Sequence, residues 1–143
     1  MKIQQPQWGI ALLRIVTGII FFVHGWQKLF TFGYEGTTGA FTGMGVPLPE
    51  IAAALAIAVE LLGGLALILG FMTRLVAVPL AIDMLAALFM VHLSSGFFAA
   101  NGGYEFVLLL AAASLALVLT GGGAFALDNL GAVRRVMPRR LRA

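Results

Sequence analysis

Two acidic residues stand alone in long apolar stretches of this sequence. Glu60 is the one charged residue of "ALAIAVELLGGLALIL" (54–69), and Asp83 lies nine residues after Arg74 in the next apolar stretch. With a helical rise of ~1.5 Å per residue, Glu60 lies about 15 Å past Glu50, near the midplane of a bilayer core about 30 Å thick. An ionised carboxylate at that depth costs at least ~2.5 kcal/mol. Both acids are therefore expected to face the protein interior, each beside a proton or a cation.

Arg14 is the cation that we expect beside Glu60. Its helix places four polar residues within an arc of roughly 80°, and this face can only point inward. The residues of the face are Arg14, Thr17, His24 and Lys28. We therefore predict that Arg14, Glu60 and Asp83 form a buried acid and counter-ion group with a catalytic role. Two other interpretations stay open: the group only fixes helix register, or Arg14 reaches the cytoplasmic headgroups.

A second set of polar residues is expected at the outer ends of the apolar stretches: His24, Lys28, His92, Asn101, Tyr104 and Glu105. Such side chains supply the hydrogen-bond donors and protons that the carbonyls of a planar, lipid-soluble quinone need. We therefore predict a ligand-binding pocket here, with a quinone as the candidate cofactor. A haem between His24 and His92 is not expected, because two histidines alone are a weak signal, and no metal site is predicted. The same residues could instead simply meet water at the membrane surface.

The composition places the chain among integral membrane proteins. Of its 143 residues, 61% are hydrophobic and only 10% are charged, whereas soluble domains carry about a quarter charged residues. The absence of cysteine excludes thiol redox chemistry, a cysteine nucleophile and thiolate metal ligation within this chain. The isoelectric point near 10 does not indicate nucleic-acid binding, because the basic residues lie where they would set membrane topology.

Four apolar stretches can be read as membrane spans: residues 8–30, 51–71, 75–93 and 106–120. Glycine and proline mark the connections between them. We expect a long glycine-rich loop over 31–50, a tight turn over 71–74, a loop over 94–103 and a basic tail over 131–143. The sequence thus predicts an all-α fold, with residues 1–143 forming a single-domain integral membrane four-helix bundle.

The basic residues predict the orientation of these spans, because lysine and arginine favour the cytoplasmic side of a membrane. With four spans, most of them fall on one side: Lys2, Arg74, Arg134, Arg135, Arg139, Arg140 and Arg142. Three glutamates fall on the other side: Glu35, Glu50 and Glu105. Both termini are therefore expected in the cytoplasm, where the basic tail could also contact anionic lipids. Lys28, at the outer end of the first span, is the exception.

The sequence also carries a family pattern, over about residues 8 to 130. An arginine precedes "HGWQK" (24–28), a single glutamate precedes "GFMTR" (70–74), and a histidine precedes "GFFAANGGYE" (96–105). In this pattern the chain resembles the DoxX family of small bacterial membrane proteins. The resemblance implies a four-helix membrane bundle with these signature positions: Arg14, His24, Gly25, Lys28, Glu60, Arg74, His92, Asn101, Gly102, Gly103, Tyr104 and Glu105.

The resemblance further implies a place in redox chemistry. Proteins of this family resemble the small quinone-reactive subunit of thiosulfate:quinone oxidoreductase, and many are named oxidoreductases without an assigned reaction. Relatives are reported to join membrane complexes with superoxide-detoxifying and sulfur-transfer enzymes. We therefore expect a multi-pass protein of the bacterial inner membrane that binds a quinone or another lipophilic ligand. It would be at most a quinone-linked subunit of an oxidoreductase system.

Two other functions stay open. The chain could be a non-catalytic membrane scaffold for a soluble redox enzyme, or a small-molecule or proton-coupled transporter, since transporters also use buried acids. Four spans make a small pathway, so a transporter would need to form a homo-oligomer. The expected partners are membrane lipids, a soluble redox enzyme and further copies of this chain, and nucleic acid is not among them.

Overall fold

The protein folds into helices joined by short turns. The computed structural model describes residues 5–136 and residue 138, and no strand occurs within that part of the chain. In chain order the elements are α1 (Gln5–Trp26), the π-helical η1 (Gln27–Thr31), α2 (Gly33–Gly43), α3 (Pro49–Leu69), α4 (Thr73–Ala87), the π-helical η2 (Leu88–His92), the short 3₁₀ turns η3 (Leu93–Ser95) and η4 (Ala99–Asn101), α5 (Glu105–Thr120), the 3₁₀ turn η5 (Leu127–Asn129) and α6 (Gly131–Val136). The predicted all-helical class is confirmed for these residues.

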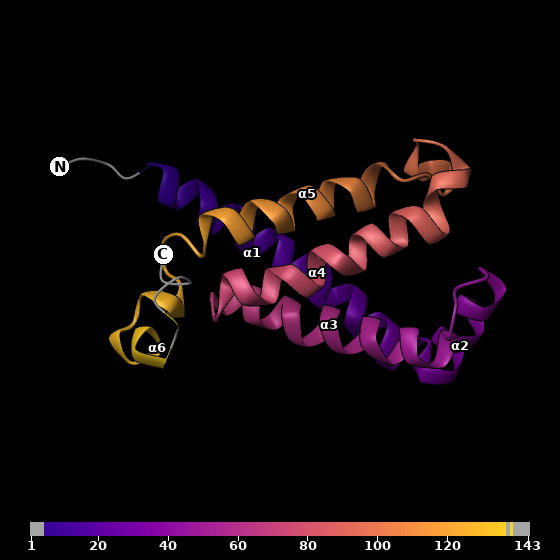
Figure 1. Cartoon of the computed structure of the whole chain (residues 1–143), viewed down its shortest axis with the longest axis horizontal. Coiled ribbons are helices and arrows are strands. Elements are labelled where there is room, and N and C mark those ends of the chain that lie inside the picture. The colour runs from indigo at the N-terminus through magenta and orange to yellow at the C-terminus, as the bar shows by residue number, and fades with distance from the viewer. Residues whose placement is uncertain (1–4, 137, 139–143) are drawn as a thin grey trace.

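Three helical segments of the described chain are long and apolar enough to cross a membrane: Pro6–Thr31, Pro49–Leu69 and Thr73–Ser95. The helix α5 is also apolar but has only 16 residues. Figure 1 shows α1, α3, α4 and α5 running along the long axis, with α2 at one end of the molecule and the start of α1 and α6 at the other. α1 packs against α3, and α4 packs against α5.

The contact between α1 and α3 is close because glycines face it. The backbone of Gly18 lies against Gly64, and that of Gly25 lies against Leu61 and Glu60. A Cβ atom at any of these glycines would overlap the facing backbone, and small residues of this kind are how membrane helices approach one another. The two contacts set an antiparallel register in which Glu60 is level with Gly25. This register decides which side chains of α1 can reach Glu60.

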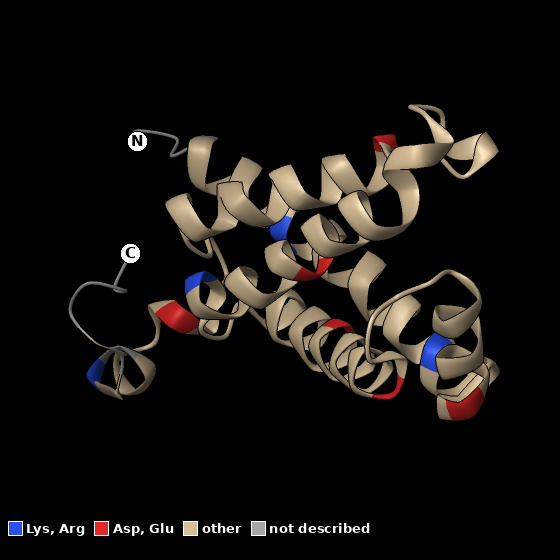
Figure 2. Ribbon diagram, turned by 45° about the vertical axis from the view of Figure 1, so that its right-hand side comes forward, with Lys and Arg blue, Asp and Glu red and all other residues tan. Residues whose placement is uncertain are grey.

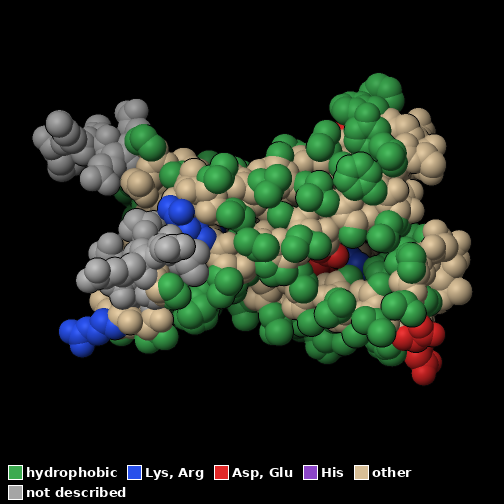
Figure 3. Space-filling model, viewed as in Figure 1, with side chains coloured by type: hydrophobic (Ala, Val, Ile, Leu, Met, Phe, Trp, Pro, Cys, Tyr) green, Lys and Arg blue, Asp and Glu red, His purple; other side chains and the backbone are tan. Residues whose placement is uncertain are grey.

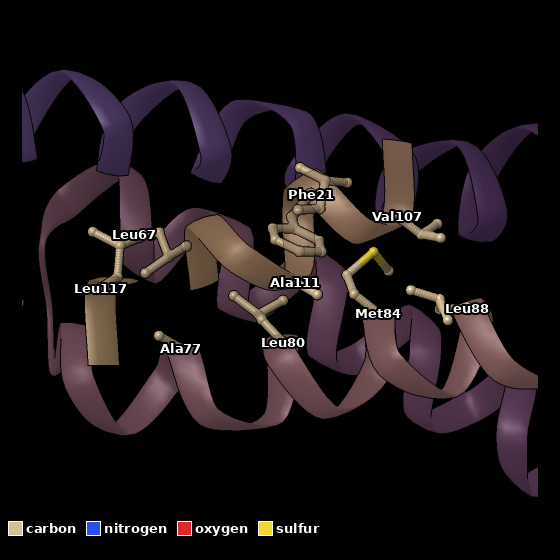
Figure 4. Close-up of a cluster of buried hydrophobic side chains, with 10 residues drawn as sticks. Phe21, Leu67, Ala77, Leu80, Met84, Leu88, Val107, Ala111 and Leu117 are labelled. Carbon is tan, nitrogen blue, oxygen red and sulfur yellow. The ribbon is translucent and has the colours of Figure 1, made fainter. Parts of the chain in front are cut away.

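The interior between the helices is filled with apolar side chains. Phe21, Leu67, Leu80 and Leu117 are almost fully buried and pack together across four helices (Figure 4). Large apolar side chains also cover the outside, as the space-filling view shows (Figure 3). An extensive apolar exterior marks a surface that meets lipid or protein rather than water. The fold therefore has both an apolar core and an apolar exterior surface, and its described part contains few buried polar side chains.

The segment 31–50, expected to be a glycine-rich loop, contains the helix α2. Glycine weakens helices, but α2 is held from outside, because it packs on η1 and α3. Thr37 is buried, and its hydroxyl donates a hydrogen bond of 2.9 Å to the main-chain carbonyl of Lys28. The expectation of a loop was wrong here because tertiary contacts override the low helix propensity of glycine.

The basic tail predicted over 131–143 is described only at its start, where Gly131–Val136 form α6. Residues 137 and 139–143, and with them the predicted lipid contact of that tail, lie outside the described residues, as does Lys2.

Candidate functional site

A cavity of about 760 Å³ opens between the helices toward the end of the molecule that carries α2. Residues of α1, α3, α4 and α5 line it, together with residues from α2, the turn after α2 and the segment before α5. Most of the lining is apolar, and its ionisable side chains are His24, Lys28, Glu60, Asp83 and His92. Charged residues are sparse along the ribbon (Figure 2), yet acidic and basic atoms meet in a hollow of the apolar face in Figure 3. The cavity thus joins residues from both predicted groups.

Glu60 is paired with Lys28 rather than with Arg14. The distance between Lys28 Nζ and Glu60 Oε2 is 2.7 Å, and the Glu60 side chain is only 4% exposed. The close helix contact at Gly25 puts Glu60 level with the end of α1, and Lys28 stands three residues beyond that glycine. A hydrogen bond with charge on both partners is among the stronger kinds. Lys28 therefore neutralises the buried Glu60.

Asp83 is the second acid of the cavity. It lies on α4, close to both Glu60 and Lys28. Its Oδ2 atom is buried and has no hydrogen-bond partner in the described structure. Leaving a buried polar atom unpaired costs about 1–3 kcal/mol. Such an atom marks a place where a proton or a polar ligand group is needed.

The two histidines also line the cavity. The Nδ1 atom of His92 lies 2.7 Å from the carbonyl oxygen of Gly102. A carbonyl only accepts, so Nδ1 carries a proton and Nε2 is left for another contact. The ring of His24 lies beside Phe106, with ring centroids 6.3 Å apart. Among residues 5–136 and 138, no three His, Asp or Glu side chains come together in a way that could hold a metal ion.

Two π-helical turns carry cavity residues. Lys28 stands in η1 at the end of α1, and His92 stands in η2 at the end of α4. Single π turns within otherwise α-helical segments occur often at functional sites, because they change the direction in which side chains leave the helix. Both long helices are thus distorted at the level of the cavity.

Arg14 is not the counter-ion of Glu60, so the predicted Arg14–Glu60 pair is wrong. Arg14 is fully buried, which also excludes contact with headgroups, and it does not line the cavity. Its nitrogens donate only to main-chain carbonyls: Nε to Gly122 (2.7 Å), Nη1 to Leu67 (2.6 Å) and Ile68 (2.8 Å), and Nη2 to Ala124 (3.2 Å). The carbonyls at the end of a helix lack partners within the helix and attract positive charge. Arg14 therefore joins α1, the end of α3 and the segment after α5.

The three other predicted residues of the outer pocket hold the loop beside it. Glu105 accepts a hydrogen bond of 2.9 Å from the main-chain N–H of Ala99. The ring of Tyr104 packs edge-on against Phe97, at 5.6 Å between centroids, and Asn101 is exposed in η4. These side chains do not line the cavity, whereas Gly102 and Gly103 of the same loop do.

Asp128 is a structural residue that sequence reasoning missed. Its Oδ1 accepts a hydrogen bond from the N–H of Met72 (2.6 Å) and its Oδ2 from the N–H of Thr73 (2.9 Å). A carboxylate at the first N–H groups of a helix satisfies donors that have no partner there and suits the positive end of the helix dipole. An aspartate after a glycine run is compatible with any turn, so the sequence offers no specific signal for this cap of α4.

Comparison with known proteins places the chain among membrane proteins. The family model DoxX matches residues 9–93. The chain is 42% identical over 120 residues to the Bacillus subtilis (strain 168) protein named "Putative oxidoreductase CatD", covering 84% of each chain. It is 36% identical over 127 residues to "Inner membrane protein YqjF" of Escherichia coli (strain K12), covering 85% of this chain and 91% of the relative. No solved structure matches it. The chain therefore belongs to the DoxX family.

Proposed function

We propose that this protein is a membrane component that binds a flat, uncharged, lipophilic ligand bearing carbonyl groups, a quinone above all, in the cavity beside Lys28 and Glu60. The observation that carries the proposal is a mostly apolar cavity whose wall holds an ion pair and an unpaired carboxyl oxygen. Its volume of about 760 Å³ lies within the range of ~300–1,000 Å³ that is usual for small-molecule sites. Such sites are largely apolar and contain a few polar groups that orient the ligand.

The residues present fit a quinone in type. An ammonium group has three N–H donors, so Lys28 retains donors beyond the one that Glu60 accepts. A ligand carbonyl could accept from Lys28 or from a ring nitrogen of His24. Phe21 and Phe106 line the same cavity and offer apolar surface to a flat ring. A bound quinone would supply electron and proton acceptance, while the protein supplies orientation, hydrogen bonds and exclusion of water.

The membrane topology is part of the proposal. We infer four crossings, by α1, α3, α4 and α5, with both termini in the cytoplasm and the protein in the bacterial inner membrane. The helix α5 is about 24 Å long at ~1.5 Å per residue, short of a hydrocarbon core of about 30 Å. The distribution of lysine and arginine supports the orientation. Because the chain has no cysteine, single cysteines placed at Gly39 and Gly131 would report which side of the membrane each one faces.

The redox role of the ligand is the remaining part of the proposal. One relative carries an oxidoreductase name and another an inner-membrane name, which supports a place in a membrane-bound oxidoreductase system. This chain has no cysteine of its own to receive electrons. A soluble partner enzyme would therefore deliver or collect the electrons, and this protein would hold the lipophilic ligand within reach.

The proposal is tested by extracting the bound ligand. The protein is purified in mild detergent with native lipids, and its organic extract is analysed by mass spectrometry beside that of an unrelated membrane protein. We expect a quinone at close to one per chain, lost in Glu60→Gln, because that change removes the charge that holds Lys28. Glu50→Gln is the matched control, since Glu50 is exposed and lies outside the cavity. Equal quinone content in this protein and in the unrelated membrane protein would contradict the proposal and favour a scaffold function.

A further inference from the structure

The ionisable groups around Asp83 do not balance in charge. Five ionisable residues line the cavity: Asp83 on α4, Glu60 on α3, Lys28 in η1, His24 on α1 and His92 in η2. Of these, Glu60 and Lys28 lie close to Asp83. The residues that α2, the turn after it and α5 contribute to the lining are apolar or glycine. Lys28 is committed to Glu60 at 2.7 Å. Arg14, which lies outside the cavity, donates to main-chain carbonyls. Two carboxyl groups thus share one fixed cation.

An added proton resolves this imbalance. A carboxylate without a counter-charge is strongly unfavourable inside a membrane, as is a buried charge that has lost its partner. The buried Oδ2 of Asp83 has no donor beside it, whereas Glu60 already receives the Lys28 N–H. A proton on Asp83 makes the three-residue cluster neutral and leaves the observed ion pair as it is. A proton on Glu60 would instead remove the charge that Lys28 contacts.

We propose that Asp83 holds the one exchangeable proton of this site, and that the cavity takes an uncharged ligand only while that proton is present. The inference rests on the proposed function, because it specifies the charge of the ligand that the same cavity accepts. Loss of the proton leaves a net negative charge in the wall. That charge attracts water into the cavity and favours a lipophilic cation over a neutral ring.

The first measurement reads the proton directly and needs no ligand. Infrared spectra of the purified protein in detergent are compared for the wild type, Asp83→Asn and Glu60→Gln. At neutral pH we expect the C=O stretching band of a buried carboxylic acid in the wild type, and its loss in Asp83→Asn. No such band in the wild type, or a band that Glu60→Gln removes and Asp83→Asn retains, would overturn the assignment of the proton to Asp83.

The second measurement tests the coupling to the ligand. Binding of a short-chain ubiquinone and of the lipophilic cation tetraphenylphosphonium is measured by equilibrium dialysis across a pH series. Above the pH at which Asp83 loses its proton, we expect quinone affinity to fall about tenfold per pH unit, as a single linked proton requires. Cation binding should rise over the same range. Asp83→Asn, which cannot ionise, should bind the quinone within about twofold of the low-pH wild type at every pH, and Glu50→Gln should behave as the wild type.

The outcomes separate the two proposals. Quinone binding by the wild type that does not depend on pH, or an equal pH dependence in Asp83→Asn, overturns the inference and leaves the proposed function standing. The latter result would mean that a group of the cavity other than Asp83 controls the binding. No quinone binding by the wild type at any pH overturns the proposed function, and the ligand part of this inference with it.

Discussion

Arg14 and Lys28 stand on one continuous helical segment, fourteen residues apart, yet their surroundings differ. Arg14 is fully buried and its donors all meet main-chain carbonyls. Lys28 is 20% exposed, contacts one carboxylate and lies in the wall of a cavity that also holds an unpaired carboxyl oxygen. At the Arg14 end, near the start of α1 and the end of α5, the guanidinium donates to four main-chain carbonyls and lines no cavity. The Lys28 region, near α2, has space and an unmet polar group.

The comparison distinguishes a charge that stabilises the fold from a charge that is available to a ligand. Around Arg14 the main chain supplies the hydrogen-bond acceptors of the guanidinium, so the cation needs no ligand. Around Lys28 the chain supplies three ionisable groups whose charges do not cancel, beside an apolar volume. A buried charge is therefore informative about function only after its partners have been counted. Substitutions in each region test this distinction, and the largest effect is expected at Arg14.

Arg14→Leu is expected to reduce stability more than any other change considered for these two regions. It removes the hydrogen bonds that the guanidinium donates to four main-chain carbonyls, and breaking a buried charged interaction typically costs about 3–5 kcal/mol. The free energy of unfolding, measured by denaturant titration in detergent micelles, should fall by about that amount. Arg14→Lys has a single ammonium group instead of a planar fork of donors, so its free energy of unfolding should lie between those of the wild type and Arg14→Leu. A loss below about 1 kcal/mol in Arg14→Leu would mean that this end of the molecule does not depend on Arg14.

The pairing of Lys28 with Glu60 can be measured by a double-mutant cycle. Lys28→Leu, Glu60→Leu and the double variant should show an interaction free energy of about 0.5–3 kcal/mol, because the residues are in direct contact. The matched cycle with Arg14→Leu and Glu60→Leu should give additive effects. Coupling in the second cycle and none in the first would reverse the assignment of the counter-ion.

Asp128→Ala removes the cap of α4 and should lower stability by about 0.5–2 kcal/mol, as loss of a capping side chain does. The cavity lies away from this cap, so quinone content should not change. Asp128→Asn retains an acceptor oxygen and should lose less. If quinone content fell as strongly as it does in Glu60→Gln, the two regions would be coupled rather than independent.

Glu105→Gln should have the smallest effect, below about 1 kcal/mol, because an amide oxygen can still accept the exposed hydrogen bond from Ala99. Glu105→Ala removes the acceptor and should shift the loop over 96–105, which hydrogen exchange of its amides would report. Unchanged exchange in Glu105→Ala would show that this carboxylate does not hold the loop.

The helical class and the burial of Glu60 could be predicted from the sequence, since long apolar stretches and a lone acid within one of them are visible in it. The partner of Glu60 could not, because it depends on the register of α1 against α3. The contacts at Gly18 and Gly25 place Glu60 near the Lys28 end of that register. The sequence predicts the depth of a residue in the membrane only to within a few residues. That precision cannot decide whether Arg14 or Lys28, which share one helix face, contacts Glu60.

The partners of Arg14 were hidden for a different reason. They are carbonyl groups of the main chain, which every residue type carries and no sequence pattern displays. The helix α2 was missed because glycine-rich segments favour loops, while the contacts that hold this one, such as the Thr37 bond to the Lys28 carbonyl, join residues distant from the local pattern. Five of the nine predicted side chains thus line the cavity, whereas the main-chain interactions were not foreseen; the five are His24, Lys28, Glu60, Asp83 and His92.

The directions in which Lys28 and His92 point depend on the number of residues in the π-helical turns η1 and η2. A π turn holds one residue more than an α-helical turn, so each acts as a one-residue insertion in a long helix. Deleting a single residue there would restore regular α-helix and leave the helix on either side nearly in phase, because the π turn absorbs the extra residue. The change would be confined to the side chains that leave the turn itself. Lys28 or His92 would then point away from the space they now face. In this protein, a single-residue deletion in either turn should therefore do more harm to the cavity than most substitutions, and homologous chains should keep these segments constant in length even where their residue types change.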